Sequence, residues 1–188
     1  LIYMTDNGSS NALSYDEAGN VIEGYNAGLR GMKDSQYDGG HRVPFFVRYP
    51  NGGIEGGWDC NALCANVDFM PTILDFCGIN PGQHTFHGQS IRSLMETPTA
   101  AEPQRFLVTD SQRVPNPIKW RKSAVMCGEM RLVDGKELYD VAKDRHQDHD
   151  IAPQYPELVE TMRNVYEEWW ELVSVKFADP IPLYICLL

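Results

Sequence analysis

Residues 31–50 read GMKDSQYDGGHRVPFFVRYP, a glycine-rich loop followed by an apolar segment. The apolar segment predicts a strand with Pro44 near its start, where the missing backbone N–H does least harm. Lys33 lies in the loop, and His41 and Arg42 come just before the strand. Glycine lets the backbone approach a ligand closely, and lysine supplies a compact charge with rotatable donors. The segment therefore predicts a site for a tetrahedral oxyanion, with a solvated loop carrying scattered charges as the alternative.

A second candidate site lies in residues 1–8, which read LIYMTDNG. The apolar run predicts a buried parallel strand that ends in the polar turn Asp6-Asn7-Gly8. Open α/β sheets place their ligands at the carboxyl ends of such strands. The carboxylate of Asp6 and the amide oxygen of Asn7 are hard donors suited to Ca²⁺ or Mg²⁺. The same tripeptide is also a frequent turn sequence, so the metal prediction depends on other residues.

Several further elements follow from local patterns. Residues 9–40 hold many glycines and predict a long functional loop. A helix is expected over residues 69–78, with Asp68 as its cap and Pro71 in its first turn. Residues 81–104 are rich in Gly, Pro, Thr, Gln and His, which predicts a surface linker.

The remaining residues predict a small antiparallel sheet covered by a helix. Apolar residues from Pro156 onward recur at helical spacing and include Trp169 and Trp170, so this amphipathic helix should cover the sheet. We therefore expect a catalytic portion over residues 1–80 and a small subdomain over 105–188. The expected strands are 105–109, 123–128, 130–135 and 137–141.

The amino-acid composition argues against nucleic acid and anionic membranes as partners. Sixteen Lys and Arg against 26 Asp and Glu give a net charge of −10, which disfavours binding to nucleic acid or to an anionic membrane. No apolar run approaches the roughly 18–20 residues that span a bilayer. An anionic ligand must therefore be held by local cations.

Taken together, these motifs resemble the formylglycine-dependent sulfatase family of the alkaline phosphatase superfamily. Residues 5–8 resemble the family's (S/T)DNG metal motif. Residues 31–50 resemble its GxKxxxxEGGxRVPxxxxxP block, with Asp38 where Glu is usual, and Lys33 falls on its sulfate-binding lysine.

Later motifs extend this resemblance to about residue 152. Residues 67–78 resemble the family's D-x-x-PT helix, and residues 87–90 resemble its DGxS turn. Residues 137–152 resemble ELYDLxxDPxExxNLA, which explains the HQDHD cluster at 146–150 as a structural turn rather than a metal site. The departures from that last segment are Arg145, Gln147 and Asp150, in place of Pro, Glu and Asn.

The resemblance implies an α/β protein: the C-terminal part of a sulfatase/alkaline-phosphatase-like fold, with a subdomain of one small antiparallel sheet plus an amphipathic helix. It implies Asp6 and Asn7 as ligands of Ca²⁺ or Mg²⁺, and Lys33 as a catalytic, sulfate-binding residue. His41 and Arg42 are further candidates for binding the substrate, a small sulfate ester or a sulfated sugar. Family members of this kind are periplasmic, secreted or lysosomal.

The nucleophile of the family is not in this sequence. Sulfatases use a Cys or Ser in C/S-x-P-x-R, converted to formylglycine, and no cysteine or serine here has proline two residues later. We expect the nucleophile and the other metal ligands in a missing N-terminal half of the same enzyme, and an isolated chain without turnover. Two alternatives stay open: a phosphate or phosphonate ester hydrolase of the same superfamily, and a truncated, non-catalytic remnant.

Overall fold

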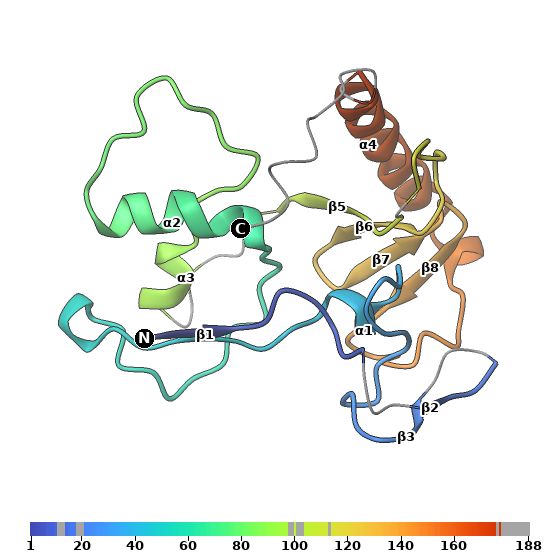
Figure 1. Ribbon diagram of the computed structural model, residues 1–188, viewed down its shortest axis with the longest axis horizontal. Helices are drawn as coiled ribbons and strands as arrows, with labels where there is room; N and C mark the ends of the chain where they lie inside the picture. Colours follow the sequence, from blue (N-terminus) through green and yellow to red (C-terminus); the bar gives the residue numbers. More distant parts are fainter. Residues whose placement is uncertain are drawn as a thin grey trace.

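Four consecutive antiparallel strands form the larger sheet in the computed structural model, which describes residues 1–10, 14–17, 21–97, 100, 104–112, 114–175 and 177. The strands lie in sequence order (Figure 1). They are β5 (Phe106–Asp110), β6 (Ser123–Cys127), β7 (Met130–Val133) and β8 (Glu137–Asp140).

Two short antiparallel pairs and four helices complete the described chain. The strand pairs are β1 (Ile2–Met4) with β4 (Phe45–Val47), and β2 (Ser14–Tyr15) with β3 (Val21–Glu23). The helices are α1 (Asp38–His41), α2 (Phe69–Phe76), α3 (Arg92–Glu96) and α4 (Pro156–Ser174). Single 3₁₀ turns lie at Pro50–Gly52, Asn66–Asp68 and Ala152–Gln154.

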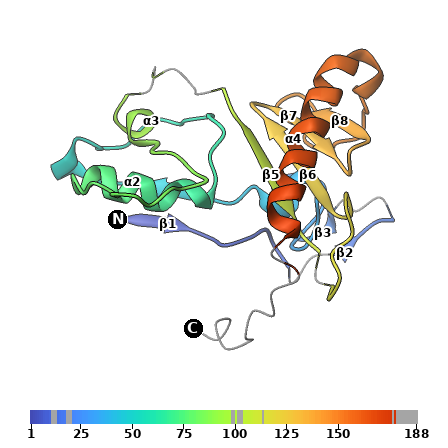
Figure 2. The same ribbon diagram turned by 90° about the horizontal axis from the view of Figure 1, so that it is seen from above.

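The main core lies between the four-stranded sheet and α4, which packs against β5 and β6 (Figure 2). Leu132 and Leu138 from the sheet and Met162 and Tyr166 from the helix are fully buried. Both Trp169 and Trp170 pack against this cluster. The predicted sheet and the predicted apolar face of α4 are thus confirmed. Apolar residues that recur every second position in a strand, or every 3.6 positions in a helix, lie on one face, and here the two apolar faces pack together.

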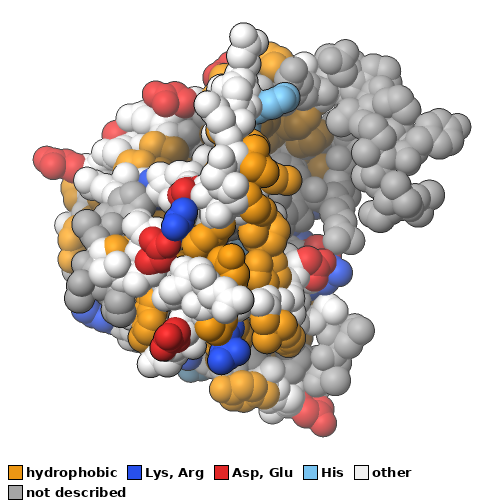
Figure 3. Space-filling model, turned by 90° about the vertical axis from the view of Figure 1, so that its left-hand side faces the viewer, with side chains coloured by type: hydrophobic (Ala, Val, Ile, Leu, Met, Phe, Trp, Pro, Cys, Tyr) orange, Lys and Arg blue, Asp and Glu red, His pale blue; other side chains and the backbone are white. Residues whose placement is uncertain are grey.

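The prediction that residues 1–5 form a buried parallel strand is wrong. Strand β1 runs antiparallel to β4, and its side chains are exposed, with Tyr3 at 57%. A strand is buried when other elements cover both of its faces, and the described chain supplies β1 with a single neighbouring strand. Hydrophobic side chains gather in a band on the side of the molecule that Figure 3 shows.

Asp68 lies at the start of α2, as predicted, but its side chain does not make the expected capping bond to that helix. Asp68 has helical backbone angles (φ −82°, ψ −14°) and makes no side-chain capping bond to α2, whereas a cap needs an extended backbone. The carboxylate instead accepts hydrogen bonds from the backbone N–H groups of Ala65 (2.8 Å) and Gln89 (3.0 Å) and pairs with Arg105. Asp68 therefore joins α2 to the segment that leads into β5.

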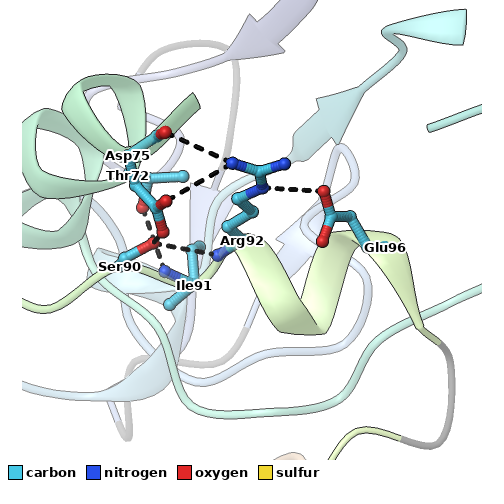
Figure 4. A network of polar contacts seen from close by, with 6 residues as sticks. All are labelled: Thr72, Asp75, Ser90, Ile91, Arg92 and Glu96. Atoms are coloured by element: carbon cyan, nitrogen blue, oxygen red, sulfur yellow. Dashed lines mark hydrogen bonds and ion pairs between the residues drawn. The ribbon is translucent and has the colours of Figure 1, made fainter. Parts of the chain in front are cut away.

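The predicted linker contains a helix, α3, which is tied to α2 by polar contacts (Figure 4). The backbone N–H of Ile91 donates to Thr72 Oγ1 (3.1 Å). The guanidinium of Arg92 contacts both Asp75 and Glu96. The division of the chain at residues 80 and 104 stays a prediction.

Candidate functional site

Three segments far apart in the sequence meet around a cavity of about 280 Å³. They are the turn after β1, the glycine-rich loop that leads into α1, and the end of β5. The structure brings together four of the five predicted site residues, Asp6, Asn7, Lys33 and His41. The other described residues that line the cavity are Asp34, Gly40, Asp110, Ser111 and Gln112.

Glycines allow the first two segments to touch. The N–H of Gly8 donates to the carbonyl of Gly40 (3.0 Å), and a Cβ on Gly8 would lie 1.8 Å from the Gly39 oxygen. The N–H of Lys33 donates to the carbonyl of Ser9 (3.0 Å). A side chain at residue 8 would therefore push the Asp6-Asn7 turn away from the loop that carries Lys33.

Buried polar contacts anchor α1 to the large sheet. The Asp38 carboxylate contacts Arg131 Nη2 (3.2 Å), and its backbone N–H donates to Gln147 Oε1 (2.8 Å). Each of these three residues is buried. Gln147 of the HQDHD segment thereby gives this segment a buried structural contact with α1.

The structure does not bring Arg42 into the cavity beside Lys33. Its Nε donates to Asp38 Oδ2 (2.5 Å), one helical turn earlier. Arg42 lines a larger cavity of about 760 Å³ that runs along β1, β4 and α2. The prediction of an anion contact at this residue rested on charge alone, whereas its direction is set by the buried Asp38 carboxylate.

His41 is held between two serines. Its Nε2 lies 3.1 Å from Ser111 Oγ, and its ring also bonds the backbone of Ser35. Burial and the nearby Arg131 guanidinium lower the pKa of His41 to about 4. His41 is therefore neutral at pH 7, and among the described residues that line the cavity Lys33 carries the positive charge.

The oxygen donors of Asp6 and Asn7 fit a hard divalent cation by type, since both line the same cavity. Their number falls short of the six to eight oxygens that Ca²⁺ takes. These two residues could therefore supply part of the ligand shell of such a cation.

Sequence reasoning missed the contribution of β5 to the cavity. Asp110, Ser111 and Gln112 lie about 70 residues or more from the other lining residues. A signal was present, because Asp110 ends an apolar strand and Asp6 comes shortly after one. What it lacked was any indication that the two strand ends meet.

Residues 31–172 match the protein family described as "N-sulphoglucosamine sulphohydrolase, C-terminal". The chain belongs to this family. It is also similar to human steryl-sulfatase, with 26% identity over 121 residues, which make up 64% of this chain and 21% of that protein. N-acetylglucosamine-6-O-sulfatase of Bacteroides thetaiotaomicron is 34% identical over 76 residues, covering 39% of this chain and 13% of that protein.

Solved structures share the fold of this sulfatase-family chain. One is Ps i-CgsB in complex with k-i-k-neocarrahexaose, with a TM-score of 0.63, 21% identity, and coverage of 89% of this chain and 35% of that one. Another is BT4656 in complex with its substrate D-glucosamine-2-N,6-O-disulfate, with a TM-score of 0.57, 20% identity, and coverage of 96% and 35%.

The predicted α/β architecture and the predicted C-terminal sulfatase portion are thereby confirmed. The chain spans about a fifth of the length of human steryl-sulfatase. Its sulfatase relatives imply the family's metal ion and formylglycine. No helix among the described residues is long and apolar enough to cross a membrane.

Proposed function

We propose that the enzyme to which this chain belongs hydrolyses sulfate esters, and that the cavity beside Lys33 binds the sulfate group. The observation that carries the proposal is the meeting of Asp6, Asn7 and Lys33 around one cavity, in a chain of a sulfatase family. Lys33 supplies positive charge in a cavity that also holds carboxylates. An ammonium at this place stabilises negative charge that develops on the sulfate oxygens.

Asp6 and Asn7 would supply two oxygen ligands to Ca²⁺ or Mg²⁺ in this enzyme. A divalent cation, when bound, acts as a Lewis acid toward an ester oxygen. The chain's own part is to fix these two ligands, because the Gly8–Gly40 hydrogen bond holds their turn against the loop of Lys33. The formylglycine nucleophile and the rest of the metal shell would come from the N-terminal half of the same enzyme.

The exposed apolar surface of β1 and β4 supports the proposal that an N-terminal half of the enzyme packs against this chain. Strand β1 leaves Ile2, Tyr3 and Met4 exposed, and Phe46 on β4 is 65% exposed. Unpaired strand edges and apolar faces of this kind associate with other chain segments. In the proposed enzyme the N-terminal half covers this surface and completes the sheet.

The test is hydrolysis of 4-nitrophenyl sulfate by the full-length enzyme, with Ca²⁺ and with chelator. Lys33→Ala should lower kcat/KM by about 100-fold or more, the effect of losing one preorganised charge-stabilising group. Asp6→Ala should raise the Ca²⁺ concentration needed for activity. Lys143→Ala is the matched control, because this lysine is 84% exposed on its side chain and lies outside the cavity.

Each alternative has its own outcome in this assay. Greater activity on 4-nitrophenyl phosphate or a phosphonate ester would establish the related superfamily hydrolase instead. A full-length product that hydrolyses none of the esters with metal present would establish a non-catalytic remnant. Full activity of Lys33→Ala would overturn the assignment of this cavity.

A further inference from the structure

The loop that carries Lys33 has an unusual backbone on both sides of this residue. Asp34, the next residue, has φ 69°, in the left-handed region that residues other than glycine seldom adopt. Gly31, two residues before Lys33, has φ 85°. Strained conformations persist where the surrounding structure holds them, and they gather at functional sites. The direction in which the Lys33 side chain leaves the backbone therefore depends on the contacts that hold this turn.

The large sheet supplies two of these contacts to one residue of the loop, Gln36. The side-chain amide of Gln36 donates to Asp134 Oδ2 (3.0 Å), and its backbone carbonyl accepts from Arg131 Nη1 (2.8 Å). The Arg131 residue is 2% exposed, so its guanidinium is enclosed by the protein. The side chain and the backbone of Gln36 are thus both bonded to groups that come about 95 residues later in the sequence.

Asp134 is itself fixed to the sheet. It lies in the turn between β7 and β8, and its Oδ1 accepts from the backbone N–H of Ser123 (3.0 Å). The N–H of Asp134 donates to the carbonyl of Ser123 (2.9 Å), which is fully buried. The neighbouring Lys122 donates through Nζ to the carbonyl of Asp34 (3.3 Å). A carboxylate held in this way offers Gln36 an acceptor at a fixed place.

We propose that Gln36 and Asp134 are positioning residues, which set the place of Lys33 in the cavity without contacting the sulfate group. Neither is among the described residues that line the cavity. The inference rests on the proposed sulfate ester hydrolysis, because it needs Lys33 to stabilise charge on the sulfate. It gives the large sheet a part in catalysis through the β7–β8 turn, in addition to its part in stability.

The test is a double-mutant comparison in the full-length enzyme, with kcat and KM measured on 4-nitrophenyl sulfate. Gln36→Met keeps a side chain of similar length but removes the amide that bonds Asp134. It should lower kcat by about 10-fold in the wild-type background, less than the roughly 100-fold cost of a displacement of about 1 Å. In the Lys33→Ala background it should change kcat by less than about 2-fold, because the group that it positions is gone.

Two further variants verify that the effect belongs to this contact. Gln154→Met is the matched control, because Gln154 is exposed in the turn Ala152–Gln154 and should leave kcat unchanged. Gln36→Asn keeps the amide on a shorter side chain and provides the same comparison if Gln36→Met does not fold. Urea unfolding of each variant shows whether it is folded.

The outcomes separate this inference from the function on which it rests. An equal loss of kcat in both backgrounds means that the contact serves stability alone and overturns the positioning role. Unchanged kcat in Gln36→Met also overturns it, and in either case the activity of the wild type and its loss in Lys33→Ala keep the hydrolase. A wild type that hydrolyses no sulfate ester refutes the hydrolase, and the positioning role falls with it.

Discussion

Replacing Arg105 with methionine should destabilise the protein by about 3–5 kcal/mol, because it leaves a buried carboxylate without its cation. The Asp68 side chain is 1% exposed and that of Arg105 is 11% exposed. Two parallel hydrogen bonds join them, Nη1 to Oδ1 at 2.9 Å and Nη2 to Oδ2 at 2.5 Å. Methionine retains apolar volume but offers no donor, so the carboxylate keeps only its bonds from Ala65 and Gln89.

Urea unfolding followed by tryptophan fluorescence measures this cost. For an m value of about 2 kcal/mol per molar urea, a loss of 4 kcal/mol lowers the midpoint by about 2 M. Adding Asp68→Asn to Arg105→Met removes the unpaired buried charge. The double variant should regain at least about 1 kcal/mol of the unfolding free energy lost in Arg105→Met, which would measure the coupling between the two residues.

Arg92→Met is the matched control for the arginine substitution. Arg92 also contacts two carboxylates (Figure 4), but its side chain is 37% exposed and solvent screens the pairs. Its midpoint shift should be a small fraction of that of Arg105→Met. Equal shifts for the two variants would refute the argument that burial of Asp68 sets the cost.

Three further predictions concern stability. Between pH 6.5 and 4 the unfolded chain takes up a proton on His41 that the folded chain does not, because the pKa of His41 is lowered in the folded state. The free energy of unfolding of the wild type should therefore fall by up to about 3 kcal/mol more than that of His41→Asn over this range. Urea unfolding of both proteins at pH 7 and pH 4 measures this difference, and equal losses contradict the prediction. Leu138→Ala should cost about 2–5 kcal/mol in the same assay, because Leu138 is fully buried against α4. Lys143→Ala should leave the urea midpoint unchanged, although Lys143 pairs with Asp140 at 2.6 Å, because its side chain is exposed.

Local pattern in the sequence determined the C-terminal part of the fold. Strands β6, β7 and β8 follow one another with short turns, each strand of the large sheet pairs with its neighbour along the chain, and the apolar stripe of α4 meets their apolar face. The motifs around Asp6 and Lys33 also named residues that line one cavity. These predictions could be made from spacing and residue type, because they depend on residues that are close together in the sequence.

Only the tertiary structure decided which distant groups meet. Ser111 reaches His41 from 70 residues away, and Arg105 reaches Asp68 from 37 residues away. The same packing turned Arg42 toward Asp38 and left β1 exposed. Periodicity reports which face of an element is apolar but not which element covers it, so contacts across the fold are settled by packing and by the pairing of buried charges.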